Sequence, residues 1–259
     1  MGVPSAPGPA VATGGFASSG ATARRMRPAY ARASIGELKA AIGTAVTVVD
    51  VAAATGILAG QLHRAGMAVV AVESVPEMLA QLRRSLPAVA ATRALADALP
   101  FANSAVEAVV VDGALHGFDA RRALVEAARV IRPGGVLAVV SNRRDSSVDW
   151  VRRFGEIIVS ARSAEWPDER DPDWEASARA TGAFGPHERS DHPNPQPSSP
   201  SALVHRAAST RIVAGMTPAA RDRVLDQVGE LTATHPDLSG RDQFDLPCRT
   251  EVQLWRRRG

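Results

Sequence analysis

The feature of this sequence that most constrains its fold is the alternation of short apolar runs with amphipathic segments. Runs rich in Val and Ala predict strands buried on both faces of a sheet, at 45–51, 67–73, 106–112 and 136–142, with a weaker run at 88–92. The segments between them carry apolar residues at helical spacing, as in 57–66, which ends at Gly66. Strands that alternate with helices through short loops predict a parallel, doubly wound α/β sheet with right-handed crossovers.

The pattern changes after the fifth predicted strand, where Pro, Asp, Glu, Arg and Ser become frequent. We expect residues 165–200 to be mostly loop, with a short strand near 184–191. Two helices should follow, at 201–215 and 217–236, the second with Thr217 as its N-cap. The alternation of apolar and polar residues around 250–254 predicts a final, antiparallel strand.

These changes in composition predict the organisation of the chain. Residues 1–15 read as a disordered lead-in, and residues 16–259 as a single domain. Within that domain we expect a cofactor-binding core over 45–145 and a flap with helical, substrate-side elaboration over 150–235.

Composition also excludes several classes of function. Hydrophobic residues make up 45% of the chain, enough for a sizeable core, and the net charge is only +3. Because basic and acidic residues are interspersed, we expect no nucleic-acid partner. No apolar stretch reaches the roughly 18 residues of a membrane span, and Cys248 is the single cysteine, so neither a disulfide nor a thiolate metal cluster is expected. The sequence therefore predicts a cytoplasmic protein with no membrane partner and no catalytic metal.

Polar residues stand at the ends of the predicted strands, namely Asp50, Glu73, Asp112 and Asn142. In a parallel sheet the carboxyl ends of the strands share one edge, and ligands bind beyond that edge. If no ligand bound at this edge, a polar residue at the end of nearly every strand would not be expected. We therefore expect these side chains to surround a ligand.

The loop after the first of these acids indicates what kind of ligand to expect. Its sequence, VVDVAAATG at 48–56, has a small residue at every second position after Asp50, unlike the G-x-G-x-x-G spacing of dinucleotide-binding loops. An acid at the mouth of the loop disfavours a phosphate and suits an ammonium or sulfonium cation. Glu73 follows at the end of the next strand, where a carboxylate can accept both ribose hydroxyls.

Several stretches, in order, resemble the class I S-adenosylmethionine-dependent methyltransferases, specifically the small-molecule group whose first motif runs close to LDLGAGTG. The matching stretches are RPAY (27–30), VVDVAAATG (48–56), VVAVE (69–73), ADALPF (96–101), ALHGFD (114–119) and ARVIRPGGVLAVVSNRRD (128–145). The resemblance covers roughly residues 16–257, with breaks over 160–200. It implies a sheet of seven strands whose last is antiparallel, and S-adenosylmethionine as the cofactor.

The resemblance also implies roles for individual residues. Glu73 would bind the ribose of the cofactor, and Asp97 would reach the adenine amino group. The expected cofactor-binding residues are Tyr30, Asp50, Ala52, Ala54, Gly56, Glu73, Ser74, Met78, Asp97, Ala98 and Asp112. Where the acceptor must lose a proton, the candidate base is His116, with Asp112 as the second candidate.

The sequence departs from the family in the glycine loop. Ala52 replaces a glycine at a position where alanine is common in such families, whereas Ala54 replaces a glycine that lets the backbone approach the cofactor. A methyl at Ala54 either crowds the ligand or, if φ is positive, costs roughly 1–2 kcal/mol. Gly117 and Ser141 stand where the family carries aromatic residues, which favours a wider pocket.

Three functions remain open at this level. The first is a methyltransferase that acts on a small molecule, in specialised (natural-product) metabolism. The second is a relative repurposed as a cyclase or other non-methylating enzyme, and the third is a cofactor-free scaffold. The sequence leaves the acceptor molecule, the acceptor atom and the oligomeric state open, with a homodimer as one alternative.

Overall fold

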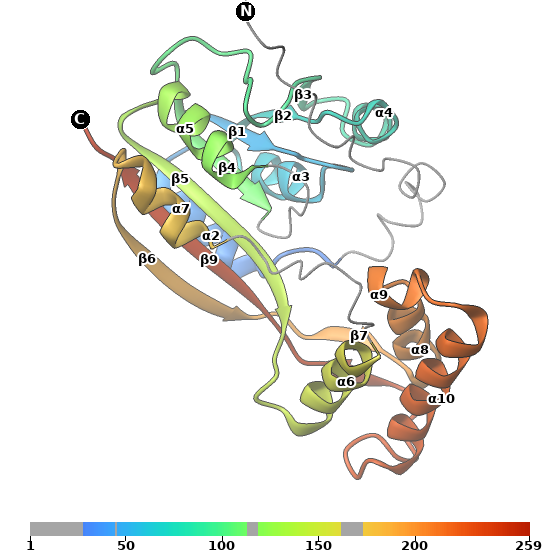
Figure 1. Cartoon of the computed structure of the whole chain (residues 1–259). Coiled ribbons are helices and arrows are strands. Elements are labelled where there is room, and N and C mark those ends of the chain that lie inside the picture. Colours follow the sequence, from blue (N-terminus) through green and yellow to red (C-terminus); the bar gives the residue numbers. More distant parts are fainter. Residues whose placement is uncertain (1–27, 45, 113–118, 162–172) are drawn as a thin grey trace, which may run out of the picture.

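A seven-stranded sheet in the order β3-β2-β1-β4-β5-β9-β6 forms the centre of the molecule (Figure 1). The computed structural model describes residues 28–44, 46–112, 119–161 and 173–259. The strands of this sheet are β1 (Thr47–Val51), β2 (Ala68–Val72), β3 (Ala90–Thr92), β4 (Val106–Asp112), β5 (Ile131–Arg144), β6 (Phe184–Pro193) and β9 (Cys248–Arg257). Strands β1 to β5 pair in parallel, and β9 pairs antiparallel with both β5 and β6. The doubly wound, mostly parallel sheet predicted from the sequence is therefore confirmed.

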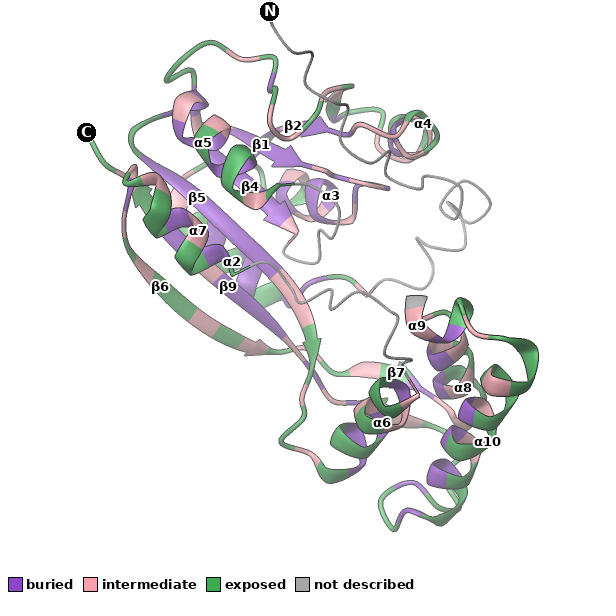
Figure 2. Cartoon of the chain, in the orientation of Figure 1, coloured by how far each residue is buried: buried purple, intermediate pink, exposed green. Residues whose placement is uncertain are grey.

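Helices cover both faces of the sheet because neighbouring strand residues point to opposite sides. One face packs against α2 (Arg32–Ile42), α3 (Ile57–Arg64) and α4 (Pro76–Ser85), and the other against α5 (Ala120–Val130) and α7 (Trp174–Thr181). Val48 belongs to the first core and Val49 to the second, and both are fully buried. Figure 2 shows the central strands as a buried layer between these helices, with β6 at the exposed edge of the sheet.

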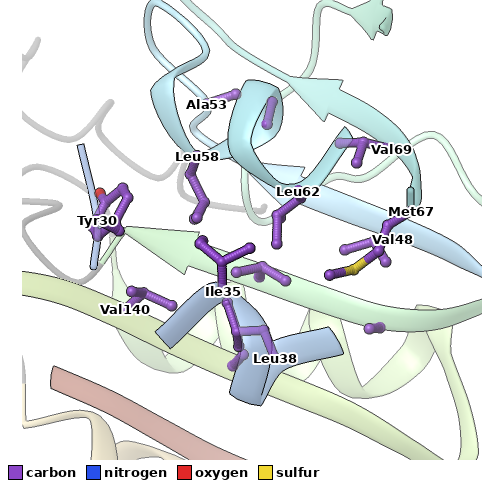
Figure 3. Packing of buried hydrophobic residues seen from close by; sticks show 14 of the residues in the cluster. Tyr30, Ile35, Leu38, Val48, Ala53, Leu58, Leu62, Met67, Val69 and Val140 are labelled. Carbon is purple, nitrogen blue, oxygen red and sulfur yellow. The ribbon is translucent and has the colours of Figure 1, made fainter. Parts of the chain in front are cut away.

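The first of these cores reaches the edge of the sheet where the strands end. Ile35 of α2 and Leu58 of α3 are buried there in the same core as Val140 of β5 (Figure 3). Tyr30, which precedes α2, is 7% exposed and belongs to the same core. The segment before α2 is thus packed beside the carboxyl ends of the strands.

A second group of helices lies beyond the end of the sheet, at the lower right of Figure 1. It contains α6 (Asp149–Ser160), α8 (Pro200–Ala208), α9 (Arg211–Ala214) and α10 (Pro218–Thr234), with a two-stranded sheet of β7 (Gln196–Ser198) and β8 (Phe244–Leu246). Its own core includes Phe154 of α6, Leu203 of α8 and Val228 of α10, all fully buried. Strands β5 and β9 run on toward this group, so the group is held at a defined place beside the strand ends.

The prediction of mostly loop over 165–200 was wrong for the part that the structure describes. Asp173 caps α7 by accepting a hydrogen bond from the backbone N–H of Ala176 at 2.8 Å, and Trp174 and Ala178, one turn apart, are buried. The strand expected at 184–191 exists as β6, which extends to Pro193. Its alternating exposed polar residues suit an edge strand, and they obscured its length in the sequence.

Other expectations at this level differ in detail or lie outside the described residues. Thr217 is the N-cap of α10 as expected, but its side chain makes no capping hydrogen bond. Within the elaboration predicted over 150–235, α7 packs on α5 and β6 joins the main sheet. The lead-in predicted over 1–15 is outside the described residues, and the boundaries at 16–259 and 45–145 stay predictions. Among the helices described here, none is both long and apolar enough to span a bilayer.

Candidate functional site

A cavity of about 980 Å³ opens at the carboxyl ends of the central strands. Asp50 of β1, Asp112 of β4 and Asn142 of β5 line it from the sheet side. Residues of α6 and α8 line it from the helical group beyond the sheet. The convergence of strand-end polar residues expected from the sequence is confirmed for these three side chains.

The loop after β1 bends through left-handed backbone conformations at alternate residues. Ala52 has φ of 54°, Ala54 has φ of 49°, and Gly56 has φ of 82°. Both alanines line the cavity. Alanine in this region costs about 1–2 kcal/mol relative to a relaxed conformation. Ala52 therefore carries the same backbone strain as Ala54.

Gly56 has a second reason to be glycine. It is the left-handed N-cap of α3, and a Cβ built on it would lie 2.7 Å from Leu86 Cδ1 and 2.9 Å from Leu82 Cγ. Those side chains belong to α4 and the residue that follows it, so α3 and α4 approach closely at this point. Gly56 shapes the loop and does not line the cavity.

Asp50 is a buried acid at the base of the cavity. Its side chain is almost completely enclosed, with the residue 1% exposed, and its Oδ2 has no hydrogen-bond partner among the described residues. Burial raises the pKa of Asp50 well above its usual value, and the nearby charges of Asp112 and Glu73 raise it further. A hydrogen bond from the backbone of Ala59, in the first turn of α3, works in the opposite direction. The site thus contains a buried acid that a cation would stabilise.

Glu73 links the end of β2 to the alanine loop. Its Oε2 accepts a hydrogen bond from the backbone N–H of Ala54 at 2.8 Å, and its Oε1 accepts one from Val75 N at 2.7 Å. The residue is 4% exposed. Its carboxylate is therefore fixed under the loop, where each oxygen keeps a lone pair for a further donor.

A polar network that the sequence did not reveal holds the segment before α2 over the cavity. The side-chain amide of Gln61 accepts from Tyr30 N and donates to Tyr30 O, both at 2.8 Å. Asn142 donates to the carbonyls of Pro28 and Ala29, and its Oδ1 accepts from Thr250 Oγ1 at 2.6 Å. Pro28 and Tyr30 line the cavity as a result.

Two further residues complete this network. Thr250 Oγ1 accepts from Ala31 N at 3.0 Å, and Asn194 donates to Ala29 O at 2.8 Å and to Asn142 Oδ1 at 3.0 Å. The only signal in the sequence was Asn142 at the end of its strand. Its partners on β9 and after β6 come close to it only through the antiparallel end of the sheet.

Other predicted cofactor residues do not line the cavity. Asp97, in the turn before β4, forms an ion pair with Arg122 of α5 at 2.9 Å, and its neighbour Ala98 is exposed. Ser74 and Met78 are half-buried around the start of α4, and Ser74 O accepts from Arg93 Nε at 3.1 Å. Their roles as cofactor contacts stay predictions. In the described ranges, no group of three or more His, Cys, Asp or Glu is placed to hold a metal ion.

Of the two candidate bases, only Asp112 lies among the described residues. Asp112, at the end of β4, lines the cavity, and its charge acts on Asp50. His116 lies in 113–118, outside the described residues. Neither role as a base is tested by the geometry, so both stay predictions.

Comparison with known proteins places the chain in a family. The model of a methyltransferase domain matches residues 49–139. A protein of Mycobacterium tuberculosis strain H37Rv, named as an uncharacterized methyltransferase, is 37% identical over 235 residues, which cover 91% of this chain and 92% of the relative. A demethylmenaquinone methyltransferase of Mycolicibacterium paratuberculosis is 36% identical over 124 residues, which cover 46% of this chain and 52% of the relative.

Solved structures show the same fold. A structure from Anaeromyxobacter dehalogenans, assigned as a type II methyltransferase, matches with a TM-score of 0.65 at 22% identity and covers 89% of this chain and 97% of that chain. The YcgJ protein of Bacillus subtilis matches with a TM-score of 0.54 at 17% identity and covers 88% of this chain and 100% of that chain. With the match over nearly the whole length of the mycobacterial relative, these findings show that the chain belongs to the class I S-adenosylmethionine-dependent methyltransferases and is an enzyme of that family.

Proposed function

We propose that this methyltransferase binds S-adenosylmethionine in the strand-end cavity and transfers its methyl group to a small-molecule acceptor. The observation that carries the proposal is the buried Oδ2 of Asp50, which has no hydrogen-bond partner among the described residues, together with Asp112 on the neighbouring strand β4. A cationic ligand compensates this charge, and S-adenosylmethionine carries both an ammonium and a sulfonium. The residues present therefore fit this cofactor.

The other predicted contacts define how the cofactor would be held. Glu73 is the candidate for the ribose hydroxyls, since both of its oxygens are already oriented by backbone amides beside the loop. Tyr30 would cover the ligand from the segment held by Asn142 and Gln61. Asp97 would serve the adenine amino group and would first have to share its carboxylate with Arg122. The bound cofactor supplies an activated methyl group.

The protein's own part in methyl transfer is alignment and the removal of a proton where the acceptor requires it. Holding the acceptor in line with the methyl group can by itself lower the barrier by several kcal/mol, on the order of 7 or more in well-oriented intramolecular reactions. Asp112 lines the cavity and would be the second candidate to accept a proton from an acceptor bound there. His116 remains the first candidate base by its position directly after β4.

Several observations support a small molecule as the acceptor. The volume of about 980 Å³ is at the upper end of the range of small-molecule pockets, and the helical group walls the cavity on the side away from the sheet. The demethylmenaquinone methyltransferase among the relatives is named for a small-molecule acceptor. We place the acceptor in specialised (natural-product) metabolism on the resemblance of the motifs alone.

Calorimetric titration with S-adenosylmethionine tests the proposal. We expect saturable binding by the wild type and at least about a tenfold loss in Glu73→Gln, because one charge-assisted hydrogen bond is worth about 1.5–3 kcal/mol. The matched control is Glu107→Gln, since Glu107 Oε2 accepts a backbone N–H from Thr47 at 2.7 Å but lies at the other end of β4. No binding at millimolar cofactor would overturn the proposed function, and equal affinity in Glu73→Gln would overturn the ribose contact.

The nature of the acceptor needs a second experiment. Methyl-labelled S-adenosylmethionine is incubated with the enzyme and cell extract, and the products are separated by mass. We expect the label in the low-mass fraction, whereas label in protein or nucleic acid would contradict a small-molecule acceptor.

A further inference from the structure

Two arginines line the cavity from elements other than the alanine loop and the strands β1 and β4. Arg144 is the last residue of β5, and Arg206 lies in the last turn of α8, in the helical group. Within the described ranges, neither side chain forms an ion pair or a hydrogen bond. The proposed function leaves both of these cations unexplained.

Neighbouring arginines on the same wall behave differently. Arg143 forms ion pairs with Glu251 and with Asp191, and Arg152 forms ion pairs with Asp149 and Glu156. These arginines have acidic partners within the protein, as is usual for surface and partly buried charges. The contrast singles out Arg144 and Arg206 as cations whose counter-charge has to come from elsewhere.

Arg144 is held in place although none of the described acids pairs with it. Its guanidinium lies over the ring of Phe154 on α6, with 5.2 Å between Cζ and the ring centroid. Phe154 is fully buried in the core of the helical group, so the stacked guanidinium has a fixed support. Desolvation in the cavity wall lowers the pKa of Arg144; a charge on Cys248 would act in the opposite direction, and the positive charge of Arg206 lowers the pKa. Both cations line the same cavity, so an anion bound there would be attracted by both.

The groups around this pair do not neutralise it. Cys248, at the start of β9, lines the same region, and burial raises the pKa of its thiol, so the thiol is neutral at ordinary pH. Asp145 is paired with Arg249 at 3.7 Å and accepts from Ser147. The acids that the sheet contributes to the cavity lining, Asp50 and Asp112, lie on β1 and β4. The cavity thus has an acidic end on the sheet and a basic end between β5 and α8.

We propose that Arg144 and Arg206 bind an anionic group, a carboxylate or a phosphate, of the methyl acceptor. Planar guanidinium groups match both anions with paired N–H donors, and two of them around one cavity select a charged acceptor over its neutral analogue. An anion held at the basic end also directs the rest of the acceptor toward the acidic end, where the cofactor is placed by the proposed function. The assignment to the acceptor rests on that function, whereas the anion site itself does not.

Direct binding of simple anions tests the site without any cofactor. Inorganic phosphate and benzoate are titrated separately into the full-length protein by calorimetry, with ionic strength held constant by sodium chloride. We expect saturable binding of at least one anion, and the anion that binds identifies the chemistry of the group. Failure of both anions to saturate the wild type would overturn the proposal.

Variants assign the binding to the two side chains. Arg144→Met and Arg206→Met keep the aliphatic stem and remove the charge, and each should weaken the anion by at least about tenfold. Arg144→Lys keeps the charge and should lose less than Arg144→Met. The matched control is Arg223→Met, an exposed arginine of α10 outside the cavity lining, which should bind as the wild type does. Wild-type affinity in both methionine variants, with circular dichroism showing that they are folded, would overturn the proposal.

A titration of the same variants with S-adenosylmethionine separates this proposal from the proposed function. We expect unchanged cofactor affinity in Arg144→Met and Arg206→Met. A cofactor loss as large as the anion loss would mean that the arginines hold the cofactor's own carboxylate, and would overturn the acceptor assignment. If the wild type binds the anion but no S-adenosylmethionine, the proposed function fails and the anion site stands.

Discussion

Replacing Ala54 by glycine should stabilise the folded protein, although glycine in place of alanine usually destabilises. The backbone of Ala54 is left-handed, with φ of 49°. That conformation costs a non-glycine residue about 1–2 kcal/mol, and the greater freedom of glycine in the unfolded chain costs about 0.5–1 kcal/mol. The balance is a gain of about 0.5–1 kcal/mol in the free energy of unfolding for Ala54→Gly.

The neighbouring residue provides the control. Ala53 is 8% exposed and is not among the residues with positive φ. Ala53→Gly relieves no strain, loses about 0.8 kcal/mol of methyl burial and adds the entropic cost of glycine, so it should destabilise by about 1–2 kcal/mol. The two substitutions make the same chemical change one residue apart, and their expected effects have opposite signs.

Urea unfolding followed by circular dichroism measures both variants. For a chain of this size a gain of 1 kcal/mol raises Tm by about 2–4 °C, so a thermal melt gives a second reading. Destabilisation of Ala54→Gly to the same extent as Ala53→Gly would refute the assignment of strain to the backbone of Ala54.

The affinity for the cofactor gives a second test of the assignment of strain to Ala54. The left-handed conformation of Ala54 is part of the folded loop, so we assign its strain to folding. We expect Ala54→Gly to change the calorimetric affinity for S-adenosylmethionine by less than about threefold, well under 1.4 kcal/mol. A gain of tenfold or more would mean that the methyl group crowds the ligand.

Two further predictions concern the same edge of the sheet. Gly56→Ala should destabilise by about 2–5 kcal/mol, because it adds left-handed strain to a clash with Leu86 and Leu82; a wild-type urea midpoint would contradict this. The raised pKa of Asp50 means that the folded state holds its proton to higher pH than the unfolded chain does, so wild-type stability falls as pH rises from the usual carboxyl value toward the folded-state pKa. Asp50→Asn removes that fall, and its stability relative to the wild type should increase across this window; parallel pH–stability curves would contradict the prediction.

The fold could be predicted in large part because its signals are local. The runs around Val49 and Val109 are apolar on both faces, as buried parallel strands require, and the acids at their ends mark the edge where the cavity lies. Helix α7 could not be predicted with the same rule, because only Trp174 and Ala178 of its two turns are buried, among charged neighbours. Strand β6 was expected as a short element, since an edge strand lacks the continuous apolar run.

The site was predicted less completely than the fold. Asp50, Asp112 and Tyr30 line the cavity as expected, whereas Asp97 is engaged with Arg122. A side chain near a strand end can face the ligand or a neighbouring helix. Helix packing decides between the two, and the periodicity of the sequence does not predict this packing. In the sequence, Arg144 appeared only as part of the motif at 128–145. That it has no ion-pair partner among the described residues could be seen only in the structure.

The sequence by itself determined the order of strands and helices up to β5, the acids Asp50 and Asp112 near two strand ends, and the family resemblance, because these depend on spacing over a few residues. Only the tertiary structure decided that both Ala52 and Ala54 are left-handed, since the conformation of a short loop follows from the elements that it joins. The hydrogen bond between Asn142 and Thr250 joins residues 108 positions apart, and the meeting of Arg144 with α8 depends on the placement of a separate helical group. Such contacts arise from packing between distant segments, which local patterns do not specify.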